Sequence, residues 1–178
     1  MINKILDILK EESDYELYDG ATEREIIDFE TKINGKLPEL LKNLYLKING
    51  GYDGGLLTFY SLDRIINIDN FDFGYYAESE TGKNIIWSFE GTEIKECFIE
   101  NHKHYYSFMD YNFGGAYWFI NLNKSDTKYG EILLLYNHMN EYYKCQPDIK
   151  SFFKTYTDCG AIEILLDSEI EIAKHLKD

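Results

Sequence analysis

Residues 22–51 constrain the fold most, because they encode two amphipathic helices together with their boundaries. Thr22 followed by Glu25 is a capping-box pattern, in which each side chain accepts a hydrogen bond from the backbone N–H of the other residue. The Asn34-Gly35 pair tolerates the left-handed turn that ends a helix. Between these boundaries, apolar residues recur on one face at helical spacing: Ile26, Phe29 and Ile33.

A second amphipathic helix is predicted directly after the first. Pro38 suits the start of a helix, where its missing N–H has no cost, and Asn49-Gly50-Gly51 is predicted to end the helix. Its apolar stripe consists of Leu40, Leu41, Leu44, Tyr45 and Ile48. The N-terminal residues also have helical apolar spacing, so the chain is expected to open with three helices.

The order of these features resembles the SUKH superfamily. The matching residues are Ile26, the Phe29-Glu30 pair, Leu37-Pro38 and Asn49-Gly50. The resemblance continues more loosely through the aromatic segment ending at Asp110, through residues 114–122 and through residues 151–156. It therefore covers most of the chain from residue 20 onward.

The resemblance carries expectations about function. Bacterial members of the superfamily are mostly immunity proteins that neutralise a cognate polymorphic toxin, and fungal members are regulators that resemble scaffolds. Neither role uses catalytic residues. The resemblance implies that residues 1–178 form a single SUKH-like domain, which is not an enzyme and needs no cofactor.

The middle of the chain has the composition of β-strands, with runs of aromatic and β-branched residues separated by Gly, Asn and Asp. Strands are predicted at residues 56–60, 73–77, 85–89, 98–100, 105–111, 117–122 and 131–136, with a helical turn at 62–66. Connections such as residues 112–116 are too short for a parallel crossover. Helices are predicted at 148–156 and from Ser168 onward. The fold class is therefore α+β, a mainly antiparallel twisted sheet with helices at both chain ends packed on it.

Composition narrows the class of protein further. A chain of 178 residues is ordinary for one domain, and no apolar run approaches the roughly 20 residues needed to cross a bilayer. Acidic residues from Asp7 onward make the N-terminus unlike a signal peptide. The three cysteines, Cys97, Cys145 and Cys159, are too few and too widely spaced for a disulfide framework. We expect a cytoplasmic protein.

The net charge of −14 is concentrated in two regions: residues 1–30 carry 10 acids and 3 bases, and residues 69–100 carry 8 acids and 2 bases. This charge disfavours nucleic acid and anionic membranes as direct ligands, because phosphate-binding surfaces need Lys and Arg. It favours a basic protein partner. The alternative is that the acidic surface only keeps the protein soluble.

No group of residues has the spacing of a metal or catalytic motif. His102, His104 and His138 are compatible with a metal site, but no HExxH or CxxC pattern accompanies them, and exposed turn histidines are the simpler interpretation. The glycines of residues 49–55 lack the Lys-Ser/Thr that follows a phosphate-binding loop. We therefore predict no metal, no cofactor and no catalytic residues.

The sixteen tyrosines suggest a recognition surface. Adjacent tyrosines in a strand point to opposite faces, so one of each pair is expected to face away from the helices. The predicted partner-binding residues are Asp72, Tyr75, Tyr76, Glu78, Glu80, Tyr106, Asp110, Tyr142 and Tyr143. Partial burial of these tyrosines in a curved sheet is the structural alternative.

The leading hypothesis from the sequence is an immunity protein that occludes the functional surface of a cognate basic toxin domain, for which a nuclease is one possibility. The alternative is a non-enzymatic regulatory scaffold or a ligand-sensing binding module of the same fold.

Overall fold

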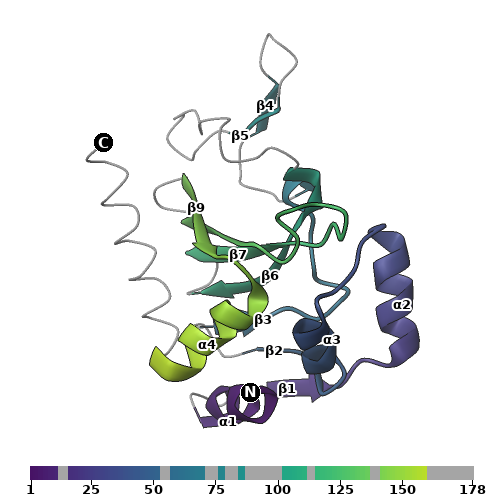
Figure 1. Ribbon diagram of the computed structural model, residues 1–178, viewed down its shortest axis with the longest axis vertical. Helices are drawn as coiled ribbons and strands as arrows, with labels where there is room; N and C mark the ends of the chain where they lie inside the picture. Colours follow the sequence, from purple (N-terminus) through teal and green to yellow (C-terminus); the bar gives the residue numbers. More distant parts are fainter. Residues whose placement is uncertain are drawn as a thin grey trace.

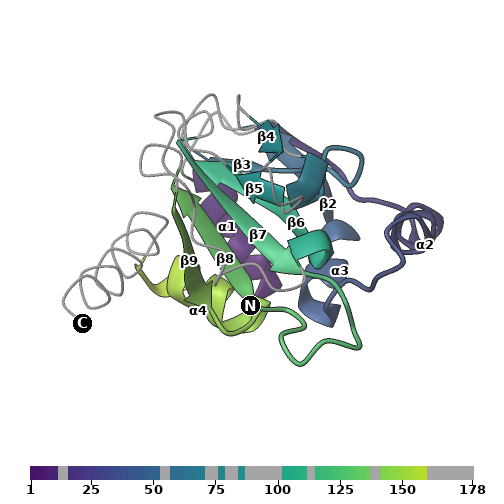
Figure 2. The same ribbon diagram turned by 90° about the horizontal axis from the view of Figure 1, so that it is seen from above.

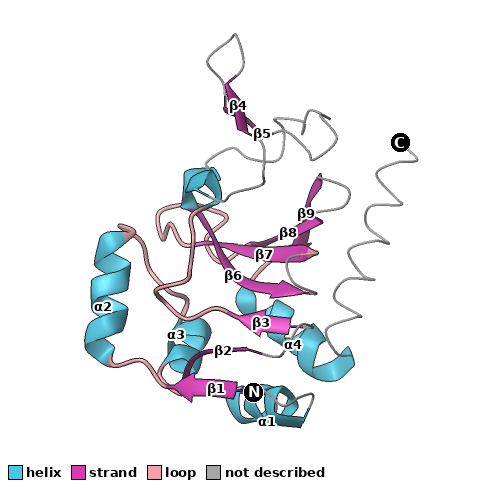
Figure 3. Ribbon diagram, turned by 180° about the vertical axis from the view of Figure 1, so that it is seen from behind, coloured by secondary structure: helices cyan, strands magenta, loops and turns pink. Residues whose placement is uncertain are grey.

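A seven-stranded antiparallel sheet forms the centre of the computed structural model, which describes residues 1–11, 16–52, 57–70, 76–78, 84–86, 102–111, 115–136 and 141–159 (Figure 1). The strand order is β1-β2-β3-β6-β7-β8-β9, and Figure 3 shows the strands rising in that order. The strands are β1 (Glu16–Asp19), β2 (Ile48–Tyr52), β3 (Leu57–Phe59), β6 (Tyr105–Tyr111), β7 (Ala116–Asn121), β8 (Ile132–Tyr136) and β9 (Glu141–Gln146). A separate two-stranded pair consists of β4 (Tyr76–Glu78) and β5 (Asn84–Ile86).

Helices lie at both ends of the described chain. They are α1 (Ile2–Glu11), α2 (Glu23–Lys32), α3 (Glu39–Tyr45) and α4 (Ile149–Cys159), with short 3-10 helices at Ile68–Asn70 and His102–His104. Figures 1 and 2 show α2 at the outer margin of the molecule, apart from the other helices. The α+β fold with an antiparallel sheet is therefore confirmed.

The main core lies between one face of the sheet and helices α1, α3 and α4. Trp118 and Phe108 of the sheet meet Phe152 of α4, with ring centroids 5.8 Å and 5.4 Å apart. Ile5 of α1 and Leu41 of α3 belong to the same cluster and are fully buried. Among the described helices, none has the length and apolar character needed to cross a bilayer.

The strongest strand predictions were right. Residues 56–60, 105–111, 117–122 and 131–136 correspond to β3, β6, β7 and β8, and β4 and β5 overlap two further predicted strands. The C-terminal helix predicted at 148–156 is α4, whereas residues 98–100 and the helix from Ser168 lie outside the described residues. The sequence prediction missed β1, β2 and β9.

The predicted end of the second helix was wrong. Helix α3 ends at Tyr45, and Ile48–Tyr52 forms strand β2 instead of a helix terminus. Ile48 continues the helical apolar spacing and is buried in the strand as well, so periodicity alone does not distinguish the two structures. Gly50 has φ of +90°, and a Cβ there would lie 2.5 Å from the backbone nitrogen of Ser61. The glycine is needed for this close approach.

A β-bulge in β6 also changes which residues of this strand lie on each face of the sheet. Ser107 lies opposite Phe119 and Met109 lies opposite Trp118, so Phe108 is an extra residue on this strand. Phe108 and Met109 both contribute to the core on the helix side. Strict alternation along residues 105–111 predicts that Asp110 shares a face with Tyr106 and Phe108. This prediction is wrong, because the bulge puts Asp110 on the face of Tyr105 and Ser107.

Candidate protein-binding surface

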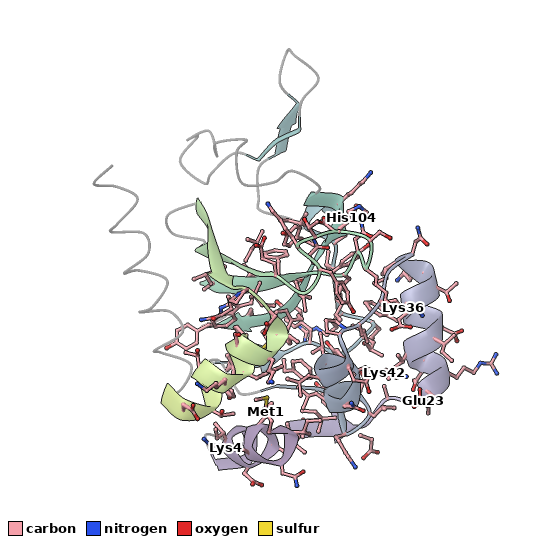
Figure 4. The ribbon with its side chains drawn as sticks, viewed as in Figure 1. Met1, Lys4, Glu23, Lys36, Lys42 and His104 are labelled. Carbon is pink, nitrogen blue, oxygen red and sulfur yellow. The ribbon has the colours of Figure 1, made fainter. Side chains whose placement is uncertain are left out.

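The residues that carry the sequence resemblance have structural roles in the fold. Glu30 of α2 is only 8% exposed, and its Oε1 accepts a hydrogen bond from the backbone N–H of Leu37 at 3.0 Å. Its Oε2 lies 2.6 Å from Nζ of Lys36, on the connection between α2 and α3 (Figure 4). Ile26 and Phe29 are buried on the same helix. Glu30 therefore holds the connection between the two helices.

The later motif residues have structural roles as well. Pro38 is the N-cap of α3, and Leu37 before it is buried. Oδ1 of Asn49 accepts a hydrogen bond from the backbone N–H of Leu62 at 3.0 Å, which ties β2 to the turn after β3. Gly50 makes the close approach to Ser61 described above. Glu30, Asn49 and Gly50 of the motif are therefore engaged in contacts within the fold.

A buried carboxylate lies among tyrosines on the sheet face opposite the main core. Asp110 is 7% exposed, and it forms a hydrogen bond with the side chain of Tyr60. Burial, followed by the negative charge of Asp110, raises the pKa of Tyr60 above its ordinary value, and the same two causes raise the pKa of Tyr117. The guanidinium of Arg64 lies 5.1 Å from the centroid of the Tyr60 ring. Asp110 is therefore part of a packed cluster.

A second polar network anchors the connection between β7 and β8. The hydroxyl of Tyr105 donates to Oε1 of Glu131 at 2.8 Å, and Nδ2 of Asn121 donates to Oδ2 of Asp126 at 3.1 Å. Burial, followed by the hydrogen bond to Glu131, raises the pKa of Tyr105. The hydrogen bond from the backbone N–H of Lys128, followed by that from Asn121, lowers the pKa of Asp126. These carboxylates hold the connection in place.

The described residues contain no group of three or more His, Cys, Asp or Glu side chains that could hold a metal ion. His104 is half-buried in the 3-10 helix before β6, near the negative charge of Asp126. For His102 the structure describes the backbone alone, and His138 lies outside the described residues.

The structure separates the predicted partner-binding residues. The register of the sheet brings Asp110 and Tyr142 into one row, which runs Thr58, Asp110, Tyr117, Leu135 and Tyr142 across five strands. Tyr106 lies on the other face, where it is half-buried with its hydroxyl 3.5 Å from the carbonyl oxygen of Ile33.

The remaining predicted residues are placed by their backbone or are not placed. Tyr143 is opposite Leu134 on β9, and Tyr76 and Glu78 belong to β4 of the small sheet. Asp72, Tyr75 and Glu80 lie outside the described residues. The structure thus brings two of the nine predicted residues into one row and places Tyr106 on the opposite face.

A different segment, residues 16–28 of β1 and the first half of α2, combines charge with exposed apolar groups. We call it the β1–α2 strip. It carries five acidic residues and one basic residue, all exposed: Glu16, Asp19, Glu23, Glu25, Asp28 and Arg24. Ile27 is 55% exposed and Tyr18 is 40% exposed, which makes them two of the four exposed large apolar residues in the described part of the chain.

Sequence reasoning overlooked Tyr18 and Ile27. Ile27 does not belong to the apolar stripe of Ile26, Phe29 and Ile33 that predicted the helix. The available signal was an isoleucine placed among charged residues on the outer face of an amphipathic helix. Tyr18 was overlooked because β1 itself was not predicted.

The β1–α2 strip is held firmly to the rest of the fold. The backbone N–H of Ala21 donates to the carbonyl of Tyr45 at 2.8 Å. In the capping box, Oε2 of Glu25 accepts from the backbone N–H of Thr22 at 2.7 Å, and this hydrogen bond is the main cause that lowers the pKa of Glu25. Glu23 lies 3.0 Å from Nζ of Lys42 on α3, and Figure 4 shows the two side chains between these helices.

The chain was compared with models of known protein families. The model of the SMI1 / KNR4 family (SUKH-1) matches residues 20–155, from the connection after β1 into α4. No curated protein matches the chain significantly.

Proposed function

The chain belongs to the SMI1 / KNR4 family (SUKH-1), and from this membership we propose that it is an immunity protein that binds a cognate toxin domain and blocks its functional surface. The sequence resemblance to the SUKH superfamily is thereby confirmed. The proposal places the protein in the cytoplasm of a bacterium and gives it a binding role without catalysis.

The observation that carries the proposal is that the motif residues support the fold, whereas exposed acidic residues lie on its surface. Glu30, Asn49 and Gly50, which belong to the family motif, are occupied in contacts within the fold. Exposed acidic side chains dominate residues 16–28. A fold whose motif residues support structure, and whose surface carries unbalanced negative charge, is suited to binding a cationic partner.

The physical mechanism is steering followed by docking. A net charge of −14 attracts a basic domain over distances near the Debye length, which is about 8 Å at physiological ionic strength. Contacts made by apolar anchors then slow dissociation. If the toxin is a nuclease, the cleft that binds phosphates in its substrate is basic and would be the natural docking site.

The test uses the protein encoded beside this gene, produced separately and purified. We expect a stable complex, and in stopped-flow measurements we expect the association rate to fall as the salt concentration rises. An association rate that is independent of salt would contradict electrostatic steering. Failure of the two purified proteins to bind would contradict the immunity role and favour the alternative of a regulatory scaffold or ligand-sensing module.

A further inference from the structure

We propose that the β1–α2 strip is the surface with which this protein docks on its partner, and that the partner presents a cationic protein surface to it. This inference rests on the proposed function, because it assigns a surface to the same binding role. It differs from the sequence prediction, which placed the recognition surface on residues of β4, β6 and β9.

The charge of the strip defines the chemistry of the partner. With five acids and one base, residues 16–28 carry a net charge of −4. Arg24 lies 3.8 Å from Asp28 of the same helix and Lys42 of α3 lies 3.0 Å from Glu23, so two of the five acids are paired with a base. Glu16 and Asp19 stand on β1 as exposed acids. Lysine and arginine side chains complement such a surface, whereas the phosphates of a nucleic acid or an anionic membrane are repelled by it.

Exposed apolar side chains contribute binding energy that charge alone does not provide. Ile27 is the most exposed of the large apolar side chains in the described residues, and it stands beside the Arg24–Asp28 pair on the outer side of α2. Tyr18 adds an exposed aromatic ring on β1. An apolar side chain surrounded by charged residues is the arrangement that concentrates binding energy at the centre of an interface. Burial of Ile27 by a partner removes apolar area from water.

Contacts within the fold also hold the β1–α2 strip in place before a partner binds. The capping box fixes the start of α2, and the ion pair between Glu23 and Lys42 fixes α2 against α3. A Cβ at Gly20 would lie 2.3 Å from the carbonyl oxygen of Leu46, so the connection between β1 and α2 passes close against the backbone that follows α3. A surface that is already ordered loses little conformational entropy when a partner binds.

The same features disfavour a second copy of this chain as the occupant. β1 is the last strand of the seven-stranded sheet, and its register shifts between Leu17 and Asp19. Two such edges would bring Glu16 and Asp19 against identical acids of the other copy. Like charges at an edge oppose self-pairing while they accept a basic partner.

The test compares two strip variants with matched controls in binding to the protein encoded beside this gene. Ile27→Ala removes the apolar anchor, and Ile66→Ala makes the same change at a residue that is 41% exposed outside the strip. Asp19→Lys reverses a charge within the strip, and Asp7→Lys reverses an exposed charge on α1. Circular dichroism and thermal unfolding establish that all four variants fold as the parent protein does.

We expect Ile27→Ala to weaken binding about tenfold, mainly through faster dissociation, and Ile66→Ala to leave the affinity unchanged. We expect Asp19→Lys to lower the association rate more than Asp7→Lys does at low salt. If the parent protein binds and the strip variants bind as well as their controls, this inference is overturned and the proposed function stands. If the parent protein does not bind, the proposed function itself is overturned.

Discussion

Glu30 is a carboxylate with almost no access to solvent, and its energetic role follows from the two groups that it satisfies. Its oxygens accept from the backbone N–H of Leu37 and from Lys36. The replacement Glu30→Ala is expected to lower the free energy of unfolding by about 2 kcal/mol, because the buried N–H of Leu37 loses its acceptor. Urea denaturation measures this change. The control Glu39→Ala, at an exposed residue, is expected to stay within about 0.5 kcal/mol of the parent protein.

Substitutions at two glycines with positive φ allow the cost of backbone strain to be measured apart from the cost of a steric clash. Gly130 has φ of +84°, and a Cβ there would meet nothing closer than Pro38 at 3.9 Å. Gly50 has φ of +90°, and its Cβ would lie within 2.9 Å of three atoms of residues 59 and 61. We expect Gly130→Ala to lower the free energy of unfolding by about 1 kcal/mol and Gly50→Ala by about 3 kcal/mol. Equal losses in urea denaturation would show that the close approach at Gly50 has no energetic weight.

At the scale of elements, strand composition predicted β3, β6, β7 and β8 because each contains aromatic or β-branched residues that are buried. The sequence Ile48–Tyr52 contains two glycines, and Glu16–Asp19 is largely exposed, so neither has the pattern of a strand. The pairing of β1 with β2, and of β2 with β3, is a tertiary effect. The bulge at Phe108 depends on how β6 pairs with β7, which local sequence does not specify.

The acidic character of the candidate surface was predictable from the sequence, whereas the position of that surface in the fold was less so. Composition identified the excess of acids in residues 1–30, from which a basic partner was predicted. Exposure of Ile27 and burial of Asp110 depend on which face of each element meets its neighbours, and this was not evident from residue spacing across the bulge. The partner-binding residues predicted on β4 and β9 stay a prediction.

Helix α1 is expected to belong to the folded domain, although it precedes the segment matched by the family. Ile5 of α1 is 0% exposed and belongs to the main core, and Lys4 lies 2.9 Å from Asp158 of α4. We expect Ile5→Ala to lower the free energy of unfolding by about 3 kcal/mol, since it leaves a cavity in the core. Urea denaturation measures this, with the exposed Ile66→Ala as control. An unchanged stability would mean that α1 is an appendage and that the domain begins later.

At the scale of the whole molecule, buried tyrosines predict how stability depends on pH. Burial raises the pKa of Tyr45, Tyr60 and Tyr105 above the ordinary value of 10.0. Above that pH the unfolded chain releases protons that the folded protein retains, so the contribution is fully present below about pH 10 and is lost as the pH rises further.

We therefore expect the urea midpoint to fall steeply above about pH 10, with the last part of the tyrosinate absorbance, that of the buried tyrosines, rising in the same transition as unfolding. Tyr105→Phe removes one of these groups and is expected to make the dependence on pH shallower. Tyrosinate absorbance that is complete before the protein unfolds would contradict the assignment of these three tyrosines as buried.

The direct pairing of β3 with β6 bears on how the length of the chain between them can vary among relatives. They pair directly in the sheet, yet residues 60–104 of the chain separate them. In general, doubling the number of residues in a loop raises the free-energy cost of closing it by only about 0.6 kcal/mol. A longer or shorter connection between these two strands therefore need not disturb their pairing, so relatives can differ in length here and keep the same sheet.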